Sequence, residues 1–181
     1  MSEIQLSTAS QMALKLETRA LDLVRFGANA ATIKDLLGSV PKSAQHELGR
    51  MQTDFKKSRM GKDASFLHQV PEAFPISNKL WAYYSILSND PSVKLPLQDN
   101  IDKMLDAYAR VFDESSEDIR AYVNFNRFVQ LLHRVGDGTI HIFKCECGTK
   151  YIGHTERPGT GCAHCRAERA RNRRKAKADE V

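Results

Sequence analysis

The chain has 181 residues, of which 41% are hydrophobic and 27% are charged. This composition excludes an intrinsically disordered protein and fits one sizeable core with room for a small appendage. The formal net charge of +5 favours nucleic acid, anionic membranes or acidic proteins as partners.

The sequence argues against a membrane protein or a secreted one. No run approaches the roughly 18 apolar residues of a membrane helix, and the segment "MSEIQLSTASQMALKLETRA" carries polar residues where a signal peptide needs an apolar stretch. We therefore expect a cytoplasmic protein with no membrane partner. In a reducing cytosol, closely spaced cysteines are metal ligands or redox groups more often than disulfides.

Residues 1–136 are predicted to form a helical body that includes a partner-binding surface. A long amphipathic helix is expected over residues 4–27. Its apolar positions recur at helical spacing, and they are Leu6, Met12, Leu16, Leu23 and Phe26. Gly27 is a plausible end for this helix.

Two short helices follow in residues 31–54, with the outline of a helix-turn-helix. Ile33, Leu36 and Leu37 share one helical face, and Gly38 can end that helix in a left-handed cap. The second helix would expose three candidate DNA-binding residues, Lys42, His46 and Arg50. A purely structural or partner-contacting role for this helix pair stays open, because such pairs are common in helical domains.

The rest of the body is read as a loop followed by three helices. Residues 56–77 show no persistent helical period, and Ser77 is expected to cap the next helix, which ends near residue 89. Further helices are expected over residues 97–114, after Pro96, and from Ser115 or Ser116 to Gly136. Their aromatic stripes are interpreted as core.

In residues 137–167 the hydrophobic pattern changes from helical periodicity to the alternation typical of β-strands. An Asp-Gly turn precedes the alternating Ile140 and Ile142, and "TKYIGH" offers a second short strand. We expect the cysteines to lie on this small β element rather than on helices. The expected fold class is thus mainly α, with a multi-helix body, a small C-terminal zinc-stapled β ribbon and a basic tail.

Four cysteines form two close pairs in this ribbon, a spacing typical of tetrahedral zinc. The predicted ligands are Cys145, Cys147, Cys162 and Cys165. The first pair is a tight C-x-C, so a histidine or carboxylate could replace one thiol, and free or redox thiols are a third possibility. The residues that could substitute are His141, Glu146, His154 and His164.

The metal is predicted to be one structural Zn²⁺ per chain. A ribbon of this size cannot bury enough apolar surface to fold unaided, whereas a structural zinc contributes roughly 10 kcal/mol towards folding. Four sulfur ligands leave no position for an activated water. The sequence carries no P-loop, dinucleotide fingerprint, nucleophile elbow or zincin motif. We therefore expect neither an enzyme nor a small-molecule substrate.

A dense basic segment follows the last cysteine, and residues 168–181 are expected to form a flexible tail. Its positive charge suits contact with nucleic acid, although a solvated tail is the simpler alternative. The candidate DNA-binding residues of this segment are Arg166, Arg169, Arg171, Arg173, Arg174, Lys175 and Lys177.

The order of elements resembles the FlhC family, the zinc-containing subunit of the flagellar master transcriptional activator. The resemblance covers roughly residues 17–170 and rests on "LVRFGA", "RAYVNFNRFVQLL", "CGTKYIGH" and "CAHC". The family's zinc-binding cysteines correspond to Cys147, Cys162 and Cys165. The family has C-x2-C at the first pair, and Lys144 stands where its first cysteine would be, with Cys145 one position later. The linker also lacks the family's tryptophan-rich stretch.

The resemblance implies a DNA-binding transcriptional activator subunit that works in a hetero-oligomer with an FlhD-like partner. Such a complex binds upstream promoter DNA, bends it and recruits RNA polymerase. The departures from the family pattern suit a divergent member, such as the FlhC-like activators of conjugative transfer carried on mobile elements. The alternative function is a zinc-ribbon RNA-binding or ribosome-associated module, since zinc ribbons with basic tails occur there too.

Overall fold

The computed structural model describes residues 7–51, 64–154 and 161–179, without the side chains of residues 68 and 177–179. It is mainly helical with a small two-stranded antiparallel sheet near the C-terminus, so the predicted fold class is confirmed. In chain order, the elements are α1 (Thr8–Arg25), α2 (Ala30–Leu37), α3 (Lys42–Met51), α4 (Phe66–Gln69), α5 (Ala73–Ser88), the 3₁₀ helix η1 (Leu97–Asn100), α6 (Ile101–Asp113), the 3₁₀ helix η2 (Ile119–Ala121), α7 (Phe125–Gly136), β1 (Ile140–Lys144), β2 (Lys150–His154) and α8 (Ala163–Asp179).

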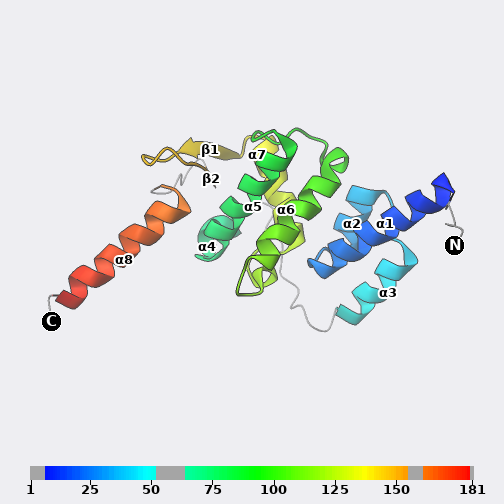
Figure 1. Cartoon of the computed structure of the whole chain (residues 1–181), viewed down its shortest axis with the longest axis horizontal. Coiled ribbons are helices and arrows are strands. Elements are labelled where there is room, and N and C mark those ends of the chain that lie inside the picture. Colours follow the sequence, from blue (N-terminus) through cyan, green and yellow to red (C-terminus); the bar gives the residue numbers. More distant parts are fainter. Residues whose placement is uncertain (1–6, 52–63, 155–160, 180–181) are drawn as a thin grey trace, which may run out of the picture.

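These elements form an elongated molecule (Figure 1). Helices α1, α2 and α3 lie at one end, α4 to α7 occupy the middle, and the β hairpin carries α8 at the other end. Helix α8 projects away from the other helices.

Helix α1 is buried only along its C-terminal half. The Ser7 hydroxyl accepts a hydrogen bond from the Ser10 N–H and caps the helix, while Leu23 and Val24 lie in the core. Met12, predicted to face inward, is 70% exposed because the first turns of α1 extend beyond α2 and α3 (Figure 1). Leu6 lies outside the described residues.

The predicted helix pair is present as α2 and α3. Gly38 ends α2 with φ at +77°, which confirms the expected left-handed cap. Ala44, on the inner face of α3, is buried in the core, and Leu48 is partly buried against that core. Residues 52–54, the end of the predicted motif, lie outside the described residues.

Two predicted helix starts are wrong. Helix α5 begins at Ala73, so Ser77 is a buried residue inside the helix rather than its cap. Pro75 is tolerated there because a helix leaves its first N–H groups without intrahelical partners. Helix α7 begins at Phe125, where the Asn124 side chain accepts the N–H of Arg127, and not at Ser115 or Ser116.

An aromatic cluster holds the middle of the body together. Phe26, at the end of α1, lies 4.8 Å from Tyr108 of α6 and 6.4 Å from Phe125 of α7, between ring centroids. The Phe125 N–H donates to the Phe26 carbonyl oxygen at 2.9 Å. Such aromatic pairs add to the stability gained from burying their area. The end of α1 is thereby fixed against α6 and α7.

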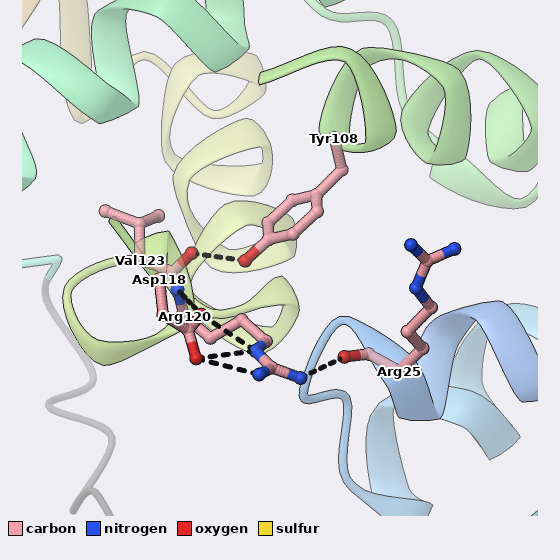
Figure 2. A network of polar contacts seen from close by, with 5 residues as sticks. All are labelled: Arg25, Tyr108, Asp118, Arg120 and Val123. Atoms are coloured by element: carbon pink, nitrogen blue, oxygen red, sulfur yellow. Dashed lines mark hydrogen bonds and ion pairs between the residues drawn. The ribbon is translucent and has the colours of Figure 1, made fainter. Parts of the chain in front are cut away.

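A polar network closes the same junction (Figure 2). The buried Tyr108 hydroxyl donates a 2.7 Å hydrogen bond to the Val123 carbonyl oxygen. Arg120 of η2 donates to the Arg25 carbonyl oxygen at the end of α1 and to the Asp118 carboxylate. Hydrogen bonding from Arg120 holds the pKa of Asp118 below its usual value. These bonds tie the α6–α7 connection to α1.

The β hairpin docks on α5. Strands β1 and β2 pair in antiparallel register with Ile142 opposite Ile152. The Asn78 side chain of α5 accepts the Ile152 N–H at 2.7 Å and donates to the Ile152 carbonyl oxygen at 3.4 Å. Phe74 of α5 packs edge-on against Tyr151, with centroids 6.4 Å apart. The second strand is thus docked on α5, while the first strand contacts α7.

Candidate metal centre and basic helix

The four cysteines come from two different elements and meet at one point. Cys145 and Cys147 lie in the turn after β1, Cys162 directly precedes α8, and Cys165 lies in the first turn of α8. Their sulfur atoms all lie within 4.8 Å of one another, and the Sγ atoms of Cys147 and Cys162 are 3.6 Å apart. Sulfurs at the corners of a zinc tetrahedron are about 3.8 Å apart. The four thiols therefore fit a metal ion.

Two glycines shape the backbone around the sulfurs. Gly148 has φ at +88° and Gly161 has φ at +114°, conformations that favour glycine. The turn after β1 is closed by the Gly148 N–H donating to the Cys145 carbonyl oxygen and by the Cys145 N–H donating to the Thr149 carbonyl oxygen, both at 2.9 Å. This tight turn lets a C-x-C pair present both sulfurs to one point.

The electrostatics of the cluster favour a cation. Hydrogen bonding with the Thr149 side chain and N–H lowers the pKa of Cys147 to about 6. Hydrogen bonding with Cys147 and Cys162 raises the pKa of Cys165 to about 12. Like charges this close oppose one another, whereas a divalent cation stabilises all four thiolates together.

The structure shows which candidate ligands lie close together. Within the described residues, the cluster of candidate ligand atoms consists of the four cysteines, and His141, Glu146, His154 and His164 do not join it. Cys145 takes part although its spacing departs from the FlhC pattern. The expectation that all cysteines lie on the β element is wrong for the second pair, which lies at the start of α8.

The basic segment, expected over residues 168–181 as a flexible tail, belongs to a helix in the structure. It is helical through Asp179, and the helix begins at Ala163, so the expected boundary at residue 167 falls inside α8. Cys162 and Cys165 stand at its start, and the Arg166 N–H donates to the Cys162 carbonyl oxygen at 3.0 Å. The turn that presents the second cysteine pair is therefore also the first turn of the basic helix.

The candidate DNA-binding residues of α8 fall into two groups. Arg166 contacts Phe74 of α5, and Arg169 lies beside the cysteine cluster, as described below. Arg166 and Arg169 are exposed, as are the residues further along, but the latter make no hydrogen bond, ion pair or ring contact with the other side chains that the structure describes. They are Arg171, Arg173, Arg174 and Lys175. Lys177 belongs to α8, and its side chain lies outside the described ones.

A second candidate surface lies on α3. Lys42, His46 and Arg50 are exposed and spaced four residues apart, so they share one face of the helix. Arg50 also pairs with Glu47 at 3.3 Å. Figure 1 places α3 and α8 at opposite ends of the molecule, so the fold does not bring the two predicted DNA-binding groups together.

Sequence reasoning missed the groups that hold the hairpin. Asn78 and Ser77 are the polar residues among the buried positions described for α5, where Asn78 stands with Phe74 and Trp81. A polar residue at a core position is a signal, because a buried amide needs hydrogen-bond partners. The partner, Ile152, is 74 residues away and could not be identified from that signal.

Among the described residues, no helix is long and apolar enough to span a membrane. No family model matches the chain, and a search of curated proteins also finds no match. The resemblance to the FlhC family therefore stays a prediction from the sequence motifs.

Proposed function

We propose that this protein is a zinc-containing, DNA-binding subunit of an FlhC-like transcriptional activator, acting in the cytoplasm. The observation that carries the proposal is the exposed basic helix α8, which starts directly at the four-cysteine cluster. A rigid base combined with a projecting positive helix suits a nucleic-acid polyanion. The link to transcription activation comes from the sequence motifs by which the chain resembles the FlhC family, such as "LVRFGA" and "RAYVNFNRFVQLL".

The metal in this proposal is one structural Zn²⁺ held by Cys145, Cys147, Cys162 and Cys165. Thiolates are the ligands that zinc prefers in closed structural sites. Because the four sulfurs complete a tetrahedron, the ion would fold the ribbon and would not activate water. The role of the zinc is then to fix the starting direction of α8.

Helix α8 has the dimensions to bind duplex DNA. Its 17 residues span roughly 25 Å, and an α-helix is narrow enough for the major groove, which is about 12 Å wide. Each arginine or lysine that contacts a phosphate releases counterions and makes binding depend on salt. Phosphate contacts position a protein but carry no sequence information, so base reading needs further side chains, with α3 as a candidate.

The proposal also requires a protein partner, an FlhD-like subunit in a hetero-oligomer that engages RNA polymerase. The projecting half of α1 supports a protein contact, since Met12 is 70% exposed and Leu14 is 57% exposed. A helix end without tertiary contacts is marginal in water, and a partner that covered these side chains would stabilise it. The target genes would be flagellar or conjugative-transfer genes.

Zinc analysis and nucleic-acid binding on one preparation test this function. The chain is purified alone and co-expressed with an FlhD-like protein, and fluorescence anisotropy compares promoter-length duplex DNA with structured RNA at equal salt. We expect one zinc per chain and duplex binding that strengthens with the partner and weakens steeply with salt. Preference for structured RNA would instead favour the RNA-binding module, and zinc without binding to either would contradict both functions.

A further inference from the structure

We propose that Arg166 and Arg169 position α8 on the hairpin and the metal centre, and that the phosphate contacts come from the outer residues Arg171, Arg173, Arg174 and Lys175. The assignment of phosphate contacts rests on the proposed function, whereas the positioning role does not. The sequence alone placed all of these residues in one DNA-binding group. Their surroundings in the fold separate them.

Arg166 joins α8 to the body through an aromatic ring. Its guanidinium carbon lies 4.1 Å from the centroid of the Phe74 ring, well within the roughly 6 Å of a cation–π interaction. Phe74 is only 4% exposed and itself packs against Tyr151 of β2. Arg166 thus completes a row of contacts that runs from α8 through Phe74 of α5 to Tyr151 of the hairpin, and its planar group is poorly replaced by lysine.

Arg169 lies against the metal centre. Its Nε donates to the Cys165 carbonyl oxygen at 3.2 Å. Its Nη2 lies 2.7 Å from the position that a Cβ would take at Gly161, and the Cys145 Sγ lies 3.2 Å from the same position. The guanidinium therefore occupies space beside the cysteine cluster that is open only because residue 161 is glycine.

This placement suits a group that supports the metal ligands. Four thiolates around a divalent ion carry a net charge of −2, and an adjacent cation offsets part of it. Groups in the second coordination sphere typically change metal affinity about 10-fold to 100-fold when they are removed. Arg169 would act in this way while also fixing the first turns of α8.

The described contacts of α8 with the rest of the chain are made near its start. Arg173 lies on the same helical face as Arg166 and Arg169, one turn beyond Arg169, and is exposed. Arg171, Arg174 and Lys175 are also exposed. Arg166 and Arg169 are exposed too, so the two groups differ in their contacts: the inner two touch Phe74 and the cysteine cluster, whereas the outer four touch no other described side chain and can meet a phosphate backbone.

The positioning role is tested without nucleic acid on the full-length zinc protein. We expect Arg169→Ala to weaken zinc binding about 10-fold in competition with a chromogenic chelator, and the matched variant Arg171→Ala to leave it unchanged. We expect Arg166→Ala and Arg166→Lys to speed amide exchange in residues 163–170 several-fold, and Arg174→Ala to have no such effect. Wild-type zinc affinity and exchange in the Arg166 and Arg169 variants would overturn the positioning role.

The division of phosphate contacts is tested by the salt dependence of duplex binding. Each lost phosphate contact lowers the slope of log K against log salt by about 0.9. We expect that decrease for Arg171→Ala, Arg173→Ala and Arg174→Ala, and an unchanged slope for Arg166→Ala and Arg169→Ala even where affinity falls. A lower slope for the inner variants would overturn the division. If the wild type binds neither duplex nor RNA, the proposed function fails, and the zinc and exchange measurements still decide the positioning role.

Discussion

The side-chain amide of Asn78 binds both backbone groups of Ile152, so a residue of α5 takes the place of a neighbouring strand along the open edge of β2. Both residues are buried. The amide satisfies backbone groups that would otherwise be buried without partners, at a cost of about 1–3 kcal/mol for each such group. This pair is a polar link between the helical body and the hairpin that carries two of the cysteines.

Replacing Asn78 should loosen the hairpin. We expect Asn78→Ala to destabilise its docking by about 2–6 kcal/mol, because the Ile152 N–H and carbonyl oxygen both lose their partner, at about 1–3 kcal/mol each. Amide exchange at Ile152, followed by NMR, measures the effect directly. Ser85→Ala, which removes a bond within α5 alone, is the matched control. Unchanged protection of Ile152 in Asn78→Ala would show that the hairpin docks without this amide.

Loss of a metal ligand should unfold the ribbon and leave the helical body intact. We expect Cys162→Ser to lose zinc and to lose amide protection in β1 and β2, because so small a ribbon depends on the metal for folding. Protection in α6 should persist, since α6 packs within the aromatic core. His164→Ala, between the two ligands of the second pair, should keep its zinc. Retention of zinc and ribbon protection in Cys162→Ser would count against the ligand assignment.

The Tyr108 hydroxyl should contribute measurably to stability. Burial raises the pKa of Tyr108 above its ordinary value, so the group stays a neutral donor to the Val123 carbonyl oxygen. We expect Tyr108→Phe to lower the free energy of unfolding by about 1–2 kcal/mol, because a buried acceptor is left unpaired. Tyr83→Phe, whose hydroxyl bonds to Glu114 near the surface, should change it by less than about 0.5 kcal/mol. Urea unfolding curves compare the two variants, and equal midpoints would contradict this ranking.

An ion pair between α1 and α6 should make stability depend on acid. Hydrogen bonding from Arg19, at 2.6 Å, and then from Lys15 lowers the pKa of Asp102 to about 2. A carboxyl whose pKa falls on folding stabilises the folded state above its unfolded pKa of about 4, and this contribution is lost as the pH falls towards 2. Because the Asp102 side chain is 51% exposed, solvent screening limits the contribution to about 1 kcal/mol or less.

The variant Asp102→Asn isolates this effect. We expect it to be less stable than the wild type near neutral pH, with the difference shrinking between about pH 4 and pH 2. Thermal unfolding at several pH values checks the trend, and Asp106→Asn controls for removing a charge from the exposed side of the same helix. A stability difference that stays constant down to pH 2 would contradict the pairing.

The sequence by itself determined the features that depend on local signals. Gly38 ended α2 because few other residues adopt its positive φ, and the alternating Ile140 and Ile142 marked β1. The two cysteine pairs indicated a metal cluster because ligand spacing is a property of short segments. These signals were enough for the fold class and for the residues of the candidate metal centre.

Only the tertiary structure decided features that depend on contacts between distant residues. Ser77 resembles a helix cap, yet burial against the hairpin favours extending α5 back to Ala73. Met12 continues the apolar face of α1, but no described helix reaches far enough to cover it. Arg166 and Arg173 look equivalent in the sequence, and only the position of Phe74, 92 residues earlier, distinguishes them. Local propensity is set by neighbouring residues, whereas burial and partners are set by how the elements pack.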